Sequence, residues 1–452
     1  MESNGCRELL ALEREQNDRL RQLLSVDYVT GLPVRRKLGE VLRPRIADSN
    51  SLPFALAVVR LDERFRRRPM SSEMAGVLLY GVGQRLTERA PDRVYQSWRT
   101  DEYIVLVDDT VDTDVLAETS AAIREAIQRP FSSSGVNIRL GCHVGFAVFP
   151  EHGRTVPELL GNAEIALGIV EQREDSSGIY HADMGYRRRR QFAIEQEITD
   201  AIQSGLDQFS LAFQPIVDRT CAIHGAEALM RWDNDALGSV PPAEFIPVAE
   251  QYGQIQILGL WAVYQAATIA RTWVGDDHLE PPVVSLNVSA VQLRDPDFAE
   301  RIIDLFATAS VPPGRFRLEL TESAIVEDPE RARETLETLR GFGVQLMIDD
   351  FGTGFSSFTY LHTLPIDTIK IAKEFVDTIV ESSHSRAIVR SIIHVAKGIG
   401  GTALAEGIET LDQFDVLMEE GCDYFQGYLF GRPQVTNDLN TLVVASDAEF
   451  RR

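Results

Sequence analysis

The second half of the chain alternates short apolar runs with helix-prone segments, and this alternation limits the fold more than any other feature. From residue 205 onward each unit takes roughly 20 to 60 residues, which is typical of parallel strands joined by helical crossovers. About 235 residues with at least seven such units match the size of a (β/α)8 barrel. We expect its strands at 225–229, 283–287, 316–320, 345–349, 368–371, 403–406 and 424–428.

Polar side chains end these predicted strands, and a barrel brings the carboxyl ends of its strands to one face. The strand-end residues are Glu227, Asn287, Glu319, Asp349, Asp350, Lys370, Glu406 and Gln426. Most of them are carboxylates, which repel one another unless cations lie nearby, and Lys370 alone is too little to balance them. Carboxylate and amide oxygens favour Mg²⁺ or Mn²⁺ and exclude a zinc-type site of nitrogen and sulfur ligands. Two such ions sharing one carboxylate, expected to be Asp349, are suited to attack on a phosphate ester.

Each of these residues, taken singly, has an ordinary explanation. Glu227 or Glu319 alone is more often a surface or helix-capping carboxylate, and Lys370 alone is usually solvated. The pair Asp349-Asp350 before a glycine-rich turn is equally compatible with a helix N-cap. The metal-site hypothesis therefore rests on the whole set, because eight unrelated accidents at strand ends would be needed to produce it.

Length and charge limit the remaining classes of protein. A chain of 452 residues exceeds what one core usually supports, so two domains are expected. With 45 Lys and Arg against 68 Asp and Glu, the net charge of −23 disfavours binding to DNA or to an anionic membrane. The 4 cysteines have no paired spacing, and no segment has the pattern of a membrane span or a secretion signal. The sequence predicts a cytoplasmic protein.

The first half of the chain predicts a separate α/β domain, with strands at 54–59, 103–107, 136–140 and 144–148 and helices at 117–128 and 156–171. Leucines within residues 5–24 predict a helix that either packs on its own domain or forms part of a dimerising stalk. The arginine run 187–190 opens a helix-prone connector. The expected divisions are an N-terminal helix at 1–24, a first domain at 25–184, a connecting helix at 185–204, the barrel at 205–440 and a tail at 441–452.

Motifs in the barrel half resemble, in order, those of the EAL family of cyclic-di-GMP phosphodiesterases over residues 205–438. The motifs are Gln214-Pro215-Ile216, Glu227-Ala228-Leu229-Met230-Arg231-Trp232, Asn287-Val288-Ser289, Glu319-Leu320-Thr321-Glu322, Asp349-Asp350-Phe351-Gly352-Thr353-Gly354, Lys370-Ile371, Ala405-Glu406-Gly407-Ile408-Glu409 and Gln426-Gly427-Tyr428. The resemblance implies hydrolysis of cyclic-di-GMP to linear pGpG with two Mg²⁺ or Mn²⁺ ions per site. Ca²⁺ is expected to bind and to inhibit, because its looser coordination misplaces the attacking water.

The resemblance also implies individual roles. One metal would be held by Glu227, Asn287, Glu319 and Asp349, and the second by Asp349 and Asp350. Lys370 and Glu406 would position and activate the attacking water. Gln214, Leu229 and Arg231 would hold the dinucleotide, and Gln426 would close the site. Glu322 would order the loop after Asp350 and so couple the contacts of a homodimer to metal binding.

One position departs from the pattern of the family. The lysine strand usually reads Lys-Ile-Asp, whereas this chain has Lys370-Ile371-Ala372. An aspartate at that position could support the charge of the lysine, so its loss is expected to lower activity or to shift metal affinity. No implied metal ligand is lost.

The first domain resembles the GGDEF family of diguanylate cyclases through the opening segment 27–36, but its signature is altered. Arg99 and Thr100 replace the two signature glycines ahead of Asp101-Glu102-Tyr103, and Arg60 replaces the first metal-binding aspartate. A cation in the place of a metal ligand should prevent productive binding of Mg²⁺ and GTP. We therefore expect no cyclase activity and a regulatory domain, while the sequence leaves open whether GTP binds there.

Two main hypotheses follow for the barrel. The first is an active cyclic-di-GMP phosphodiesterase, favoured because every implied metal ligand is present. The second is a receptor that binds the dinucleotide without turnover, for which Ala372 is the main argument. Hydrolysis of another phosphodiester on the same metals is a lesser alternative.

Overall fold

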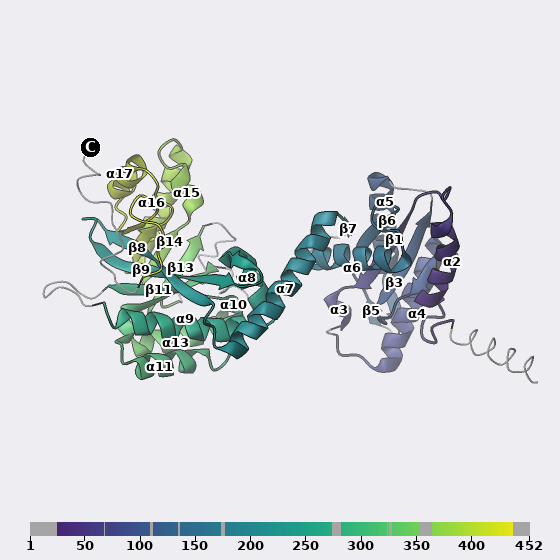
Figure 1. Ribbon diagram of the computed structural model, residues 1–452, viewed down its shortest axis with the longest axis horizontal. Coiled ribbons are helices and arrows are strands. Elements are labelled where there is room, and N and C mark those ends of the chain that lie inside the picture. The colour runs from purple at the N-terminus through teal and green to yellow at the C-terminus, as the bar shows by residue number, and fades with distance from the viewer. Residues whose placement is uncertain are drawn as a thin grey trace, which may run out of the picture. The chain divides into compact units, whose positions relative to one another are not determined.

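The computed structural model describes residues 25–66, 68–108, 112–133, 136–172, 177–273, 282–322, 324, 328–352 and 364–436. Contacts divide the chain into two compact units, residues 1–190 and 191–452, and the division falls within helix α7 (Ala182–Ser204) (Figure 1). The predicted N-terminal helix and the predicted tail lie outside the described residues. Among the described helices, none is both long enough and apolar enough to cross a bilayer.

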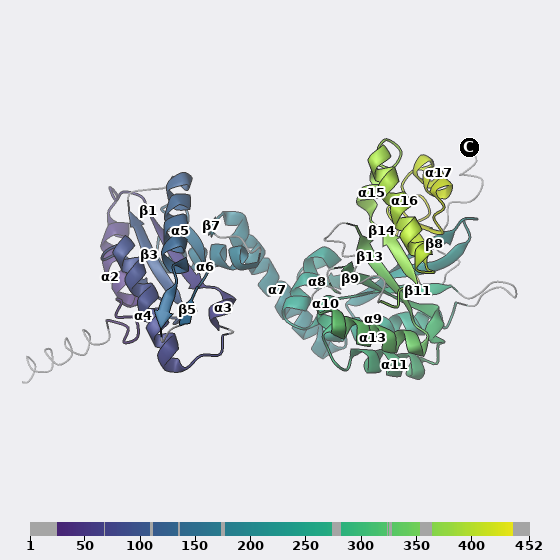
Figure 2. The same cartoon turned by 180° about the vertical axis from the view of Figure 1, so that it is seen from behind.

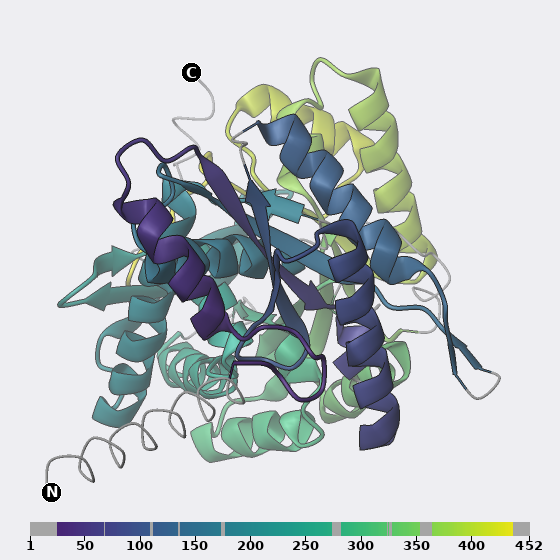
Figure 3. The ribbon, with the colours of Figure 1, turned by 90° about the vertical axis from the view of Figure 1, so that its right-hand side faces the viewer.

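The first unit is built on a five-stranded sheet with the order β2-β3-β1-β6-β7. Its strands are β1 (Phe54–Leu61), β2 (Val94–Gln96), β3 (Glu102–Asp108), β6 (Cys142–Phe149) and β7 (Ser177–Ile179). Its helices are α2 (Arg35–Ala47), α3 (Glu63–Arg66), α4 (Ser72–Arg89), α5 (Thr113–Gln128) and α6 (Val156–Gln172). A separate hairpin of β4 (Phe131–Ser133) and β5 (Val136–Ile138) extends away from this sheet (Figure 3, blue).

Strand β1 is buried on both faces, which explains its continuous apolar run. Ala55, Ala57 and Val59 belong to one core, which also holds residues of α4 and α5, while Leu56 and Val58 belong to a second core with residues of α2 and α6. Successive side chains of a strand point to opposite faces, so one strand supplies both cores. The sequence prediction of a strand here and of helices at 117–128 and 156–171 is confirmed.

The second unit is an eight-stranded barrel with the order β9-β11-β12-β13-β14-β15-β16-β8, closed by pairing of β8 with β9, and β10 adds to the outside of β9. The strands are β8 (Phe209–Asp218), β9 (Ile223–Asn234), β10 (Gly238–Val240), β11 (Val283–Val288), β12 (Phe316–Thr321), β13 (Gln345–Phe351), β14 (Thr368–Ile371), β15 (Thr402–Ala405) and β16 (Tyr424–Gln426). The predicted barrel is confirmed, since each of the predicted strands overlaps one of these.

Strand β8 corrects the prediction of a wholly parallel sheet. It runs antiparallel to both β9 and β16. Only a short turn joins it to β9, in which the Asp218 carboxylate accepts hydrogen bonds from the Thr220 and Ala222 amides. A turn of this length makes a hairpin, because a parallel connection needs a crossover of a dozen or more residues.

Helices cover the outside of the barrel. They are α8 (Pro242–Gln251), α9 (Ile255–Ala270), α10 (Ala290–Leu293), α11 (Phe298–Ala309), α13 (Pro329–Phe342), α15 (Lys373–Asp377), α16 (Ser383–Gly398) and α17 (Leu411–Glu420), with a 3-10 turn η1 (Pro313–Arg315) before β12. Helices α9, α11 and α13 flank one side of the barrel and α15, α16 and α17 the opposite side (Figures 1 and 2).

The main core lies between the strands and these helices, whereas the apolar filling of the barrel interior is small. Ile216, Met347 and Leu404 form that inner cluster, with Tyr424 packed against it. Because the inward positions above this cluster are not apolar, the carboxyl ends of the strands can present polar side chains to a common centre.

Candidate metal and phosphate site

Lys370 lies at the centre of the barrel mouth and contacts four carboxylates. Its Nζ is 2.8 Å from an oxygen of Glu319, 3.3 Å from Glu227, 3.3 Å from Glu406 and 3.4 Å from Asp349. The ammonium is buried, with 1% of the residue exposed. These side chains come from β9, β12, β13, β14 and the end of β15, so strands far apart in the sequence converge here as predicted.

The charges of this cluster are poorly balanced. Burial opposes the charge of Lys370, but the four carboxylates outweigh it and raise its pKa well above the usual value. Burial, and then the charge of Glu227, raise the pKa of Glu319 to about 8. Burial also acts to raise the pKa of Glu227, but Lys370 and hydrogen bonds from Gln426 and Asn287 outweigh it and lower that pKa. One ammonium therefore does not neutralise the carboxylates, which leaves the site with excess negative charge.

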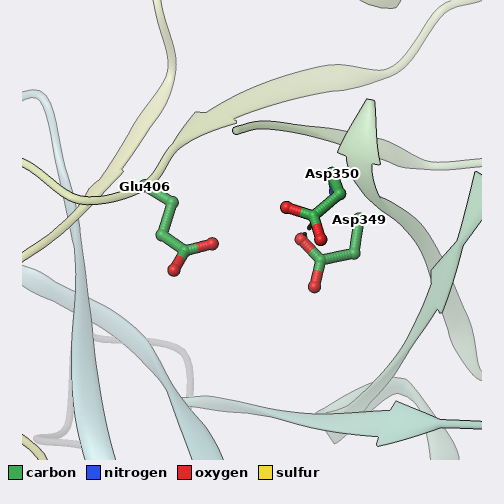
Figure 4. A group of neighbouring side chains, drawn as sticks. All are labelled: Asp349, Asp350 and Glu406. Carbon is green, nitrogen blue, oxygen red and sulfur yellow. Dashed lines mark hydrogen bonds between the residues drawn. The ribbon is translucent and has the colours of Figure 1, made fainter. Parts of the chain in front are cut away.

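Asp349, Asp350 and Glu406 face one another at the mouth, and each offers an oxygen within 4.8 Å of the others (Figure 4). The pairing of β13 with β14 shifts between Ile348 and Phe351, so the two aspartates occupy a bulge. Asp350 has a φ of 53°, which aspartate tolerates better than most residues. Burial, and then the charge of Asp349, raise the pKa of Asp350. We call Glu227, Glu319, Asp349, Asp350 and Glu406 the acidic cluster.

Three amide side chains complete the site. The Gln426 amide donates to Glu227 at 2.7 Å and to Gln214 at 3.2 Å, and the Asn287 amide donates to Glu227 at 2.7 Å. The Gln214 amide donates to the Gly431 carbonyl at 3.2 Å. These bonds fix Glu227, which is 5% exposed, between β8, β11 and β16.

The donor set fits hard divalent cations. All of its ligand atoms are oxygens, as Mg²⁺ and Mn²⁺ prefer. Two oxygens at the site, Glu319 Oε1 and Gln426 Oε1, are buried without a hydrogen-bond partner in the described part of the chain. Such acceptors are costly to leave unpaired, and a cation would satisfy them.

The remaining predicted site residues lie around the cluster. Leu229 and Asn287 both line a cavity of about 410 Å³ beside the site, bounded by α8, α9 and α10. The Arg231 guanidinium donates to the Met230 carbonyl at 2.9 Å. Glu322 directly follows β12 and is partly buried.

Arg317, which lies two residues before Glu319 on β12, was not among the predicted site residues. Alternate residues of a strand share a face, so this spacing could have placed Arg317 inside the barrel. It is 2% exposed, and its guanidinium lies 5.8 Å from the centre of the Tyr424 ring.

Ala372, the departure from the motif, begins helix α15. It is 3% exposed and stands at the N-cap without a side-chain hydrogen bond. An aspartate at this position would supply an N-cap acceptor and a further negative charge beside Lys370.

The first unit places Arg60 and Glu102 together. Arg60 Nε and Nη2 both donate to Glu102 Oε2, at 2.9 and 2.7 Å, and Nη1 donates to Glu171 at 2.7 Å. Glu102 is fully buried and also accepts a hydrogen bond from the Ser97 hydroxyl at 2.6 Å. Arg99, whose Nε donates to Asp101 at 3.2 Å, lies in the turn between β2 and β3.

Each half of the chain matches a known protein family. The family model described as "EAL domain" matches residues 195–433, and the model described as "Diguanylate cyclase, GGDEF domain" matches residues 24–177. A signalling protein of Caulobacter vibrioides is 32% identical over 447 residues, which cover 96% of this chain and 54% of the relative. MucR of Pseudomonas aeruginosa, a bifunctional diguanylate cyclase/cyclic di-GMP phosphodiesterase, is 29% identical over 432 residues, 94% of this chain and 62% of MucR.

A solved structure of the MucR phosphodiesterase in complex with c-di-GMP resembles the barrel. It is 32% identical, has a TM-score of 0.50, and covers 54% of this chain and 99% of the other. The chain spans roughly half the length of the curated relatives it matches. The chain belongs to the EAL family, and its EAL domain follows a GGDEF domain.

Proposed function

We propose that the barrel hydrolyses cyclic-di-GMP to linear pGpG with two Mg²⁺ or Mn²⁺ ions. The observation that carries this proposal is the acidic cluster, whose charge exceeds what the buried Lys370 supplies. The comparison with a phosphodiesterase structure in complex with c-di-GMP supports the choice of substrate.

The proposed metal ligands divide into two sets, one for each cation. Glu227, Asn287, Glu319 and Asp349 would hold one cation, with Asp349 and Asp350 serving the second. The bound cations would activate a water molecule and stabilise the charge that develops on the phosphate. Lys370 and Glu406, whose side chains lie 3.3 Å apart, would position that water and hold its proton.

Dinucleotide binding is assigned to residues around the mouth. Gln214 and Gln426 are in contact with each other next to Glu227. Leu229 borders the adjacent cavity, and Arg231 would exchange its backbone contact for a bidentate phosphate contact. Glu322 would act on the segment that follows Asp350, of which residues 353–363 lie outside the described part of the chain.

For residues 25–184 we propose a regulatory domain without cyclase activity. Support comes from Arg60, which already directs its donors to Glu102 and Glu171. A buried carboxylate that is paired with an internal guanidinium is a poor ligand for a metal, because the cation would have to displace the arginine. We propose in addition a connecting helix at 185–204, a barrel domain at 205–440, and a homodimer as the assembly.

One observation favours a second function, a c-di-GMP receptor without turnover. Ala372 stands where the resemblance implies an aspartate that could support Lys370, and the N-cap of α15 has no side-chain acceptor. If the absence of that aspartate disables the lysine, the barrel would still bind the dinucleotide.

The deciding experiment incubates the purified protein with cyclic-di-GMP and Mg²⁺ or Mn²⁺ and follows pGpG by chromatography. We expect turnover in the wild type, loss of turnover in Glu227→Ala, and unchanged turnover in Glu300→Ala, which alters an exposed carboxylate on α11. Binding without turnover in the wild type would establish the receptor.

Replacing Mg²⁺ with Ca²⁺ should preserve metal binding but stop hydrolysis. The larger, more loosely coordinated ion would misplace the attacking water relative to Lys370 and Glu406. Turnover with Ca²⁺ at the Mg²⁺ rate would count against the two-metal arrangement.

A further inference from the structure

We infer that Arg317 places a fixed positive charge in the floor of the barrel and thereby weakens the binding of divalent cations by the acidic cluster above it. The inference rests on the proposed metal site. It adds a residue that acts on metal affinity through charge rather than through coordination.

The side chain of Arg317 crosses the barrel interior. Strands β12 and β16 are separated by three strands in either direction around the closed sheet, so they lie on opposite sides. The Arg317 guanidinium nevertheless lies 5.8 Å from the centre of the Tyr424 ring, which belongs to β16. His224 of β9 stacks on the same ring, with 4.1 Å between ring centres. Arg317, Tyr424 and His224 therefore form a layer across the floor.

This layer lies directly beneath the metal site. In the strand pairing, Arg317 is level with Ser285 and Gln345, whereas Glu319 is level with Asn287 and Met347. Two residues along a strand correspond to roughly 7 Å, so the Arg317 side chain leaves its strand one layer below the carboxylates.

The charge of Arg317 is not cancelled locally. Its guanidinium donates to the neutral Gln345 side chain, Nη2 at 2.9 Å and Nε at 3.3 Å, and forms no ion pair within the described part of the chain. Asp367 also faces this region, but it is paired with Arg340 at 3.3 Å and accepts a hydrogen bond from the Leu346 amide.

His224 adds no second positive charge to the floor. Burial, and then the positive charge of Arg317, lower the pKa of His224 to about 4, so the imidazole is neutral near pH 7. The carboxylate whose charge acts most strongly on Arg317 is Glu319 of the acidic cluster, and Asp367 also acts on it. A charge shared in this way stabilises the cluster without metal and opposes an incoming cation.

The test is titration of Mn²⁺ into metal-free full-length protein by calorimetry. We expect Arg317→Met to bind Mn²⁺ roughly ten-fold more tightly than the wild type, since a unit charge across roughly 10 Å of protein is worth at least this much. Arg317→Lys keeps the charge and should stay within about two-fold of the wild type. A purely packing role would not separate these two variants by charge.

A second variant keeps the arginine in place. Gln345→Glu sets a carboxylate against the guanidinium and should also tighten Mn²⁺ binding. Native circular dichroism combined with unchanged or weaker affinity in Arg317→Met would overturn the inference. If Arg317→Met does not fold, unchanged affinity in Gln345→Glu overturns it.

The experiment also separates this inference from the proposed function. Glu227→Ala should abolish binding of the Mn²⁺ ion that Glu227 would hold, because it removes a ligand of that ion. Retention of wild-type binding in Glu227→Ala, or no binding by the wild type, would overturn the metal site itself and with it the role of Arg317. Loss in Glu227→Ala together with no effect of either floor variant would overturn only the role of Arg317.

Discussion

In each domain a cation lies among carboxylates, but the number of carboxylates around that cation differs. Arg60 serves two carboxylates, Glu102 and Glu171, each 2.7 Å away. Lys370 serves four, at 2.8 to 3.4 Å, with Asp350 close by. The multiple donors of a guanidinium suit shared pairing, whereas a single ammonium among four carboxylates leaves negative charge in excess. A carboxylate cluster therefore suggests a metal site only where the protein's own cations fall short.

The largest expected effect comes from removing Lys370. Lys370→Met leaves buried carboxylates without their cation, which should cost about 3 kcal/mol or more of unfolding free energy in the absence of metal. Turnover should fall at least about 100-fold, because the variant also loses a group that positions the water. Chemical denaturation with and without Mg²⁺, together with the pGpG assay, measures both effects.

The matched control is Lys373→Met, three residues later on the same segment. Lys373 is 46% exposed and pairs with Glu409 at 2.6 Å and Asp377 at 3.1 Å. Exposed pairs contribute little, so stability and turnover should remain close to wild type. Equal losses in the two variants would contradict the central role of Lys370.

The next effect should come from Arg60. Arg60→Met leaves the fully buried Glu102 without its guanidinium partner and should destabilise the first domain by about 2 to 4 kcal/mol. Arg89→Met is the control, since Arg89 forms an exposed pair with Glu125 at 3.4 Å.

Arg60→Asp should give the first domain a stabilisation by Mg²⁺ that the wild-type domain lacks. Thermal unfolding with and without Mg²⁺ tests this, and the absence of any such gain would mean that Arg60 does not stand in for a metal.

Much of the barrel site could be predicted from the sequence, because the residues at strand ends follow from the alternation of strands and helices. Glu227, Glu319, Asp349, Lys370 and Glu406 lie together as expected. The burial of Lys370 and its individual contacts could not be predicted, since a lysine at a strand end, taken alone, is usually solvated. Which carboxylates surround it depends on strand register and barrel closure, and neither is a local property of the sequence.

Strand β8 and Arg317 show why other features were not predicted. Pro215 interrupts the apolar run of β8, and proline argues against a strand paired on both sides. In the barrel this strand nevertheless pairs with both β9 and β16. Arg317 shares its strand face with Glu319, yet an arginine read alone suggests solvent. Only the closed barrel shows that the position is enclosed.

A smaller effect is expected at Ala372. Ala372→Asp would add a carboxylate beside Lys370 and an N-cap acceptor for α15, and should raise turnover about five-fold, equivalent to about 1 kcal/mol. Ala372→Asn is the matched control, since it supplies the cap without the charge. Steady-state pGpG formation separates the two variants. If Asn increases turnover as much as Asp, charge at this position is not what limits the lysine.

The smallest effect should come from a cluster near the surface in which two arginines pair with one carboxylate, the reverse of the barrel site. Glu420 on α17 accepts hydrogen bonds from both Arg386 and Arg390, the latter at 2.6 Å, and these hydrogen bonds and charges lower its pKa to about 2. A lowered folded-state pKa stabilises the fold above about pH 4.5 and loses that contribution as the pH falls toward 2. Glu420→Gln should therefore cost about 0.5 to 1 kcal/mol at neutral pH and nothing near pH 2, because exposed arginines are well screened. Urea unfolding of both proteins across this pH range measures the difference, and a deficit that persists at the acid end would show that shape rather than charge holds Glu420 in place.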